Sequence, residues 1–300
     1  MPDPLLYLQA TLATAIVSAV IVLAMAGWWR RGSPVWLNGV SVWAVVIGLT
    51  VGYGMLGFRA VWPPVTGLNR LLLIVVPIAV GLELISGWTE RPVWIFPIVR
   101  TGLALAIPRI LLHDSVYLNG TDHPWSMGMV TTILCFSGLL LAGVGALIRS
   151  LSRRSGGFAI PMALGLTTLC AGLVLMMSGY LKGGTAALPL AATVISTSVS
   201  VATFTKWMKG PEASCSAAAI GIVGLFGLLF IGRFFGRLSS VCAIILFLVP
   251  LLCWVTELPQ LRNRNPRLLE IVRLLLVAIP LSTVLVLAKR DFDRNMGLLL

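Results

Sequence analysis

Charged side chains are scarce in this chain of 300 residues, and hydrophobic ones take their place. Only 11% of the residues are charged, whereas 58% are hydrophobic, and the mean hydropathy is +0.98. A soluble domain carries about 25% charged residues, because a water-facing surface needs polar side chains. The composition therefore excludes a soluble globular protein and predicts that lipid surrounds most of the chain.

The distribution of the few charges predicts helices that cross a membrane. Seven long runs contain no charged residue, at 4–29, 32–58, 123–148, 155–181, 183–205, 213–232 and 238–256. A helix needs roughly 20 apolar residues to cross a hydrocarbon core of about 30 Å, and the short alternating segments of a transmembrane β-barrel are missing. We therefore expect an all-α polytopic bundle of about ten transmembrane helices, at 5–28, 36–57, 69–88, 93–112, 125–148, 158–180, 186–205, 215–232, 239–256 and 268–288.

Histidine, paired cysteines and short catalytic motifs are also rare, which narrows the classes of function. The five cysteines are odd in number and lie in apolar runs, so they predict small buried side chains rather than disulfides or a zinc site. The motifs GxxxxGK[ST], HExxH, CxxC and GxSxG are missing, as is an aspartate-rich prenyl-diphosphate motif. These absences favour a function without catalysis, and we expect no cofactor and no bound metal.

The basic residues, 22 against 10 acidic ones, lie mostly in the short gaps between apolar runs. This placement is typical of positive-inside topology and of contact with anionic headgroups, so we expect lipid, not nucleic acid, as their partner. With the N-terminus outside, twelve basic residues lie inside and nine outside, and Arg30-Arg31 directly follow the first span. We predict that orientation, in a plasma membrane such as the bacterial inner membrane. Met1-Pro2-Asp3-Pro4 has no basic residue, so we expect the first run to be retained as a span.

One polar segment, 149–157, divides the predicted spans into five and five. An odd number of spans per half would give the halves opposite orientations, as in transporters built from inverted repeats. The count resembles the architecture of the drug/metabolite transporters, although no motif and no internal similarity accompany it. We expect a single transmembrane domain over residues 1–300, with 149–157 as the candidate boundary between two halves.

Two charged residues lie inside predicted spans, where an ionised side chain is costly unless it is paired or hydrated. At about 1.5 Å per residue, Glu83 lies about 11 Å and Arg100 about 14 Å below the turn near Glu90-Arg91. These matched depths on consecutive helices predict an ion pair that faces the bundle interior. The pair is either a structural link or part of a pathway for a solute or ion, and the sequence leaves both interpretations open.

Both histidines of the chain lie in one loop, as His113-Asp114 and Asp122-His123. These side chains are of the types that bind metals or transfer protons, but their spacing matches no zinc or catalytic signature. A polar interfacial loop with a turn at Asn119-Gly120 accounts for the same residues.

A stripe of hydroxyl side chains runs along the predicted seventh span, at Thr193, Ser196, Thr197, Ser200 and Thr203. Spacings of three and four residues place them on one helix face. We predict that this face lines an internal polar cavity shared with Glu83, and that Pro189 lets the helix bend there. The alternative is a dry face, whose hydroxyls bond their own backbone or a neighbouring helix.

These features favour a transporter-like protein for a small polar or charged solute. The alternatives are an enzyme or assembly factor that acts on a lipid-linked substrate at the 113–123 loop, and a scaffold without catalysis. Glycine pairs at Gly48/Gly52 and Gly232/Gly236 predict close helix contacts, either within the chain or with partner membrane proteins and further copies. A cavity that reaches Glu83, Arg100 or the hydroxyl stripe of the seventh span would indicate the transporter, and a cleft beside the loop would indicate the enzyme.

Overall fold

The computed structural model describes residues 4–28, 34–88, 94–119, 126–155, 158–208, 215–258 and 266–297. Within these ranges the chain is helical throughout apart from turns and short connections, and ten segments are long and apolar enough to cross a membrane. The predicted all-α polytopic bundle is confirmed, and most expected span limits lie within a few residues of the observed ones.

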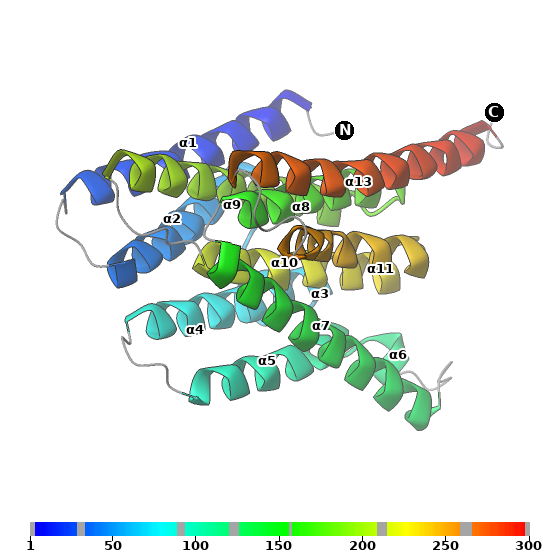
Figure 1. The fold of residues 1–300 in the computed structure, drawn as a ribbon. Helices are drawn as coiled ribbons and strands as arrows, with labels where there is room; N and C mark the ends of the chain where they lie inside the picture. Colours follow the sequence, from blue (N-terminus) through cyan, green and yellow to red (C-terminus); the bar gives the residue numbers. More distant parts are fainter. Residues whose placement is uncertain are drawn as a thin grey trace.

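Several of the ten spans are interrupted or extended helices. Their elements are α1 (Pro4–Trp28), α2 (Pro34–Met55), α3 (Gly67–Arg70), η1 (Leu71–Val75), α4 (Val76–Trp88), α5 (Ile95–Leu112), α7 (Met127–Ser155), α8 (Ala159–Met177), α9 (Leu181–Met208), α10 (Cys215–Phe235), α11 (Ser240–Leu248), η2 (Val249–Glu257) and α13 (Pro266–Gly297), with the short α6 (Val116–Asn119) between α5 and α7. η1 is a π-helical turn and η2 a 3-10 helix. Figure 1 shows the start of α1 and the end of α13 on one side of the bundle, and the end of α4 and the start of α5 on the other.

α10 is the central helix of the bundle, and 72% of its apolar window is buried. It packs against α2, α4, α7, α8 and α9. Small residues permit this, because a Cβ atom at Gly224 would collide with Leu190 of α9 and one at Gly227 with Leu71 of η1. The apolar core of the protein therefore forms around one glycine-rich helix.

α1, α2 and α9 form a second close contact, in which the glycine pair of α2 lies against polar residues. A Cβ atom at Gly48 would come within 2.7 Å of the Thr193 Cγ2 atom, and one at Gly52 within 2.8 Å of the Pro189 Cβ atom. The close helix contact expected at the Gly48/Gly52 face is thus made within the chain, by α1 and α9.

The hydroxyl stripe of α9 takes part in this packing. Thr193 donates a hydrogen bond to the Leu190 carbonyl oxygen at 2.9 Å, and Ser196 donates one to the Ala15 carbonyl oxygen of α1 at 2.5 Å. Thr197 and Ser200 are buried, whereas Thr203 is exposed and bonds the Val199 carbonyl oxygen. At Thr193 and Ser196 the stripe packs closely against α2 and α1; the polar cavity expected along the whole stripe stays a prediction.

The segment 149–157, expected to be a polar boundary, is largely helical. Residues 149–155 are the last two turns of α7, and residues 156 and 157 lie outside the described ranges. α7 therefore carries Arg149, Arg153 and Arg154 as an extension of its span. Helices from both sides of the segment pack together, since α9 contacts α1 and α2 and α10 contacts α4.

The four cysteines whose side chains are described are free thiols. Cys170 and Cys253 are buried, as expected for small apolar side chains, and Cys242 is half-buried. Cys135 departs from the expectation, because it is exposed on α7. The side chain of Cys215 lies outside the described residues.

The contact between α2 and α9 predicts that alanine at position 52 lowers the stability of the protein, whereas alanine at position 54 of the same helix does not. Gly52→Ala places a methyl group against Thr14 and Pro189 and should lower the free energy of unfolding by about 1–3 kcal/mol. Gly54→Ala is the matched control, because no atom lies within 4 Å of its Cβ position. Thermal unfolding in detergent measures both variants, and equal stability would contradict the packing.

Candidate functional site

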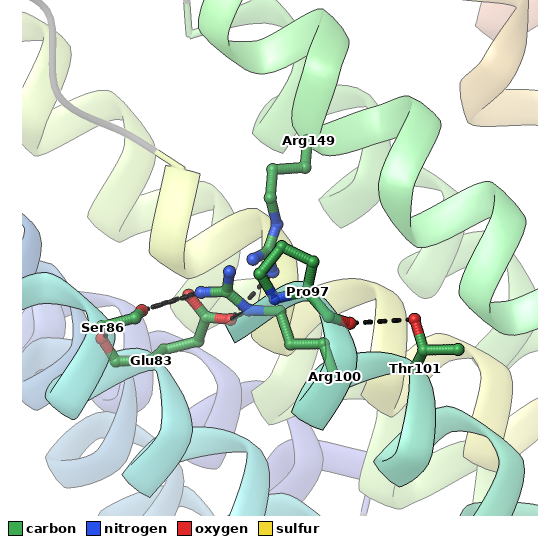
Figure 2. Close-up of polar contacts among 6 residues, drawn as sticks. All are labelled: Glu83, Ser86, Pro97, Arg100, Thr101 and Arg149. Atoms are coloured by element: carbon green, nitrogen blue, oxygen red, sulfur yellow. Dashed lines mark hydrogen bonds and ion pairs between the residues drawn. The ribbon is translucent and has the colours of Figure 1, made fainter. Parts of the chain in front are cut away.

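Three helices meet at one buried carboxylate. Glu83 of α4 is 6% exposed, and its two carboxylate oxygens accept hydrogen bonds from the Arg100 Nε and Nη2 atoms of α5, each at 3.0 Å. Arg149 of α7 donates a third, from Nη2 to Glu83 Oε1, at 2.8 Å. Figure 2 shows the two guanidinium groups approaching the carboxylate from different helices. The predicted Glu83–Arg100 pair is present, and Arg149 joins it.

A serine fixes the orientation of the Glu83–Arg100 pair. Ser86 lies one turn after Glu83 on α4, donates to the Glu83 carbonyl oxygen at 3.1 Å and accepts from Arg100 Nη2 at 2.7 Å. The Arg100 guanidinium also lies 5.8 Å from the centre of the Phe96 ring, a distance typical of a cation–π contact. Arg100 is thus held on its carboxylate by two bonds in parallel, the strongest geometry for such a pair.

Arg149 was not recognised as a site residue from the sequence, where it counts among the basic residues between spans. The last strongly apolar run before it ends at residue 148, so hydropathy alone ends the span there. In the structure the helix continues and brings the side chain back toward the bundle. The available signal is the recurrence of arginine at 149 and 153, which places both side chains on one helix face.

A cavity of about 770 Å³ surrounds this ion cluster. Its walls come from α4, α5, α7 and α10, with Trp94 at the start of α5, and the volume lies within the roughly 300–1,000 Å³ typical of small-molecule pockets. The described lining includes one carboxylate, Glu83, and four arginines: Arg100, Arg149, Arg153 and Arg154. Among the described lining residues none belongs to α9, so the hydroxyl stripe does not line this cavity.

The helices around the cavity belong to two packing groups. α4 packs mainly against α2 and α10, whereas α5 packs mainly against α7. α4 and α5 are consecutive but make little direct contact with each other. The ion cluster therefore links α4 to the α5–α7 pair on the side of the bundle where the cavity lies.

The polar loop holds its two described candidates in a turn. Asp114 has a φ of 53°, and its Oδ2 atom lies 2.8 Å from His113 Nδ1 and 3.4 Å from the buried Arg70 Nη2 atom. Arg70 also donates to the carbonyl oxygens of His113 and Pro64. The other two candidates, Asp122 and His123, lie outside the described residues.

These contacts assign Arg70, His113 and Asp114 to a turn that caps the end of α5. Arg70 supplies donors to a carbonyl oxygen that the helix leaves without an internal partner. Within the described part of the chain, no group of three or more His, Cys, Asp or Glu side chains is placed to hold a metal ion.

A second buried ion pair lies outside the cavity. Arg273 of α13 is 4% exposed and donates to Glu257 Oε1 at 2.7 Å and to Thr256 Oγ1 at 2.6 Å. None of these three residues lines the cavity around Glu83. The pair therefore offers a control for the loss of buried charge away from the candidate site.

We predict that the carboxylate matters more for stability than either arginine alone. Glu83→Gln leaves the half-buried guanidinium groups of Arg100 and Arg149 without their counter-charge and should cost up to about 3 kcal/mol, the lower end for a buried pair, whereas Arg149→Gln leaves the Glu83–Arg100 pair intact and should cost less. Asp291→Asn, at an exposed carboxylate of α13, serves as the control for charge removal. Unfolding in detergent ranks the variants, and an unfolding energy of Glu83→Gln equal to that of Asp291→Asn would refute the proposed role.

Comparison with known protein families and with curated proteins yields no matching family model and no matching relative. Function is therefore argued from the residues and geometry of the site.

Proposed function

We propose that this protein is a transporter and that its solute is a small anion bound in the cavity beside Glu83, Arg100 and Arg149. The single observation that carries the proposal is the excess of positive charge in the cavity lining. Four arginines face one carboxylate there, and guanidinium groups pair with carboxylate and phosphate oxygens in a planar geometry. A cavity with this charge attracts anions and repels cations.

Glu83 occupies the place that a bound anion would take. Its carboxylate accepts bonds from both Arg100 and Arg149, so it offsets part of the positive charge of the site. Arg100 has two bonds to Glu83 and one to Ser86, whereas Arg149 reaches Glu83 Oε1 from α7. An incoming anion therefore competes with Glu83 for Arg149, while the Glu83–Arg100 pair stays in place.

The helix geometry around the cavity supports movement. The span that carries Glu83 contains the π-helical turn Leu71–Val75 directly before Pro77. Wide turns of this kind and prolines interrupt the regular bonding of a helix, and interrupted helices beside a mid-membrane site recur in transporters. Movement of α7 relative to α4 would require Arg149 to leave Glu83, which links solute binding to the change of shape.

Two alternatives are less well supported. An enzyme at the 113–123 loop would use His113 and Asp114, whose side chains pair with each other, but Asp114 is also bound to Arg70 in the turn that ends α5. A scaffold would need no cavity and no excess of positive charge in its lining. The cavity at Glu83 favours the transporter over both.

We further propose that the N-terminus lies outside a plasma membrane and that the cavity faces the cytoplasm. The cavity includes Trp94, Arg153 and Arg154 on the side opposite the start of α1. That side also carries Lys206 at the end of α9. Basic residues concentrate on cytoplasmic ends of membrane helices, which supports this orientation.

The proposal predicts that Arg149 is needed both for binding of the anion and for its transport. Arg149→Gln should weaken binding of methyl phosphate about 10- to 100-fold, the effect of losing a charge-assisted hydrogen bond of about 1.5–3 kcal/mol. Titration of the protein in nanodiscs measures affinity, and uptake of labelled methyl phosphate into proteoliposomes measures transport. Arg273→Gln is the matched control, since it also breaks a buried ion pair but lies outside the cavity, and it should leave affinity unchanged.

Removal of the Glu83 carboxylate, which competes with the solute for Arg149, should strengthen binding of the anion. Glu83→Gln removes the internal anion, so added methyl phosphate should raise its unfolding temperature more than that of the unmodified protein. Binding without any flux would contradict the transporter, and a loss of affinity in Arg273→Gln equal to that in Arg149→Gln would contradict the site.

The orientation is tested with single cysteines at opposite ends of the bundle. In a background without the five native cysteines, Val116→Cys, on the side of the termini, should react with an impermeant maleimide in intact cells. Trp207→Cys, at the end of α9, should react only after permeabilisation. Both side chains are well exposed, at 69% and 67%, so a reversed labelling pattern would mean the opposite topology.

A further inference from the structure

The cavity around Glu83 has two chemically different ends. Its charged residues lie near the ends of α4 and α7 and the first turns of α5, where Ser86 and Trp94 also line it. Further along the helices its wall is mostly apolar: Leu103, Ala142 and Val223 are half-buried and keep accessible surface, and the buried Ile107, Leu141 and Ile222 lie behind them. The cavity is therefore amphipathic along its length.

The apolar wall lies deeper in the membrane than the arginines. Ile107 follows Arg100 by seven residues on α5, and Leu141 precedes Arg149 by eight residues on α7. At about 1.5 Å per residue these separations correspond to about 10 Å and 12 Å along the helices. A ligand whose charge is bound at Arg149 thus has room for an uncharged part below it.

A small hydrated anion leaves this lower part without a partner. Water gains few hydrogen bonds among side chains such as Leu103, Ile107 and Ile222, whereas an alkyl or aryl group buried there is removed from water at a favourable free energy. The shape and lining of the cavity fit an anion with an apolar portion better than they fit an inorganic ion.

We infer that the ligand of this cavity is an amphiphilic organic anion. Its acidic group binds Arg149 together with Arg153 and Arg154, and its apolar part lies against the half-buried Leu103, Ala142 and Val223. The inference rests on the proposed function only in placing the ligand in this cavity. Such an anion comes from one of two sources, a water-soluble metabolite with an apolar group or a membrane lipid with an acidic headgroup.

The test is a series of monoalkyl phosphates, from methyl to hexyl, titrated against the protein in nanodiscs of a neutral phospholipid. Inorganic phosphate is the chain-free member. Affinity should rise about fourfold with each methylene until the apolar part is filled, because each buried methylene contributes about 0.8 kcal/mol. Equal affinity from inorganic to hexyl phosphate would overturn the inference and leave the proposed anion transporter standing. No binding of any member would overturn both.

Two substitutions of alanine by leucine test where the alkyl group of the ligand binds. Ala142→Leu fills the apolar part and should remove most of the gain from methyl to hexyl phosphate, while affinity for inorganic phosphate stays the same. Ala106→Leu, on the exposed face of α5 outside the cavity lining, should change neither. If both variants lost the dependence of affinity on alkyl length, or if both kept it, the placement of the alkyl group beside Ala142 would be contradicted.

Nanodiscs of two lipid compositions distinguish a water-soluble organic anion from a membrane lipid as the ligand. Hexyl phosphate is titrated into discs with and without about one-fifth phosphatidic acid, which carries the same acidic group on a membrane lipid. Displacement by the lipid identifies a lipid headgroup as the ligand, because a lipid already in the bilayer would occupy the arginines. Unchanged affinity identifies a water-soluble organic anion. Arg149→Gln should abolish the displacement, and its persistence in that variant would place the lipid elsewhere and contradict this site.

Discussion

The structure around the cavity depends on keeping one carboxylate ionised among membrane helices. Removing such a group from water costs several kcal/mol unless opposite charges and hydrogen bonds compensate for the loss. Glu83 receives that compensation from two arginines on two other helices. Consequently α4, α5 and α7 must meet at one depth, and the positions of all three are tied to a single side chain.

Two kinds of contact hold the bundle together, and they leave different amounts of space. Where α2 meets α1 and α9, glycines bring the backbones close and hydroxyl groups bond neighbouring carbonyl oxygens. Where α4 faces α5 and α7, long charged side chains bridge a wider gap. The cavity lies at the second kind of contact because an arginine spans a distance that a glycine contact closes. Packing and candidate function thus divide between different groups of helices.

The sequence predicts most of the fold because hydropathy alone locates the spans, and it predicts the Glu83–Arg100 pair because both residues lie at matched depths. Arg149 is missed because hydropathy does not show whether a helix continues beyond its last apolar residue. The close packing of Thr193 and Ser196 is missed for a different reason. Periodicity places hydroxyls on one face, but it does not identify the helix opposite, and Gly48 and Gly52 turn out to supply that contact. Pairings across distant helices, such as Arg70 with the His113 carbonyl oxygen, have no local signal.

An experimental structure of the protein bound to an organic anion in a lipid nanodisc tests the central claim most directly, namely that Glu83 holds Arg149 in place of a solute. The account predicts an acidic group within about 3 Å of the Arg149 guanidinium, Arg149 separated from Glu83, and Arg100 still paired with it. An anion bound away from the cavity, with Arg149 still donating to Glu83 Oε1 as in the unbound protein, would contradict it.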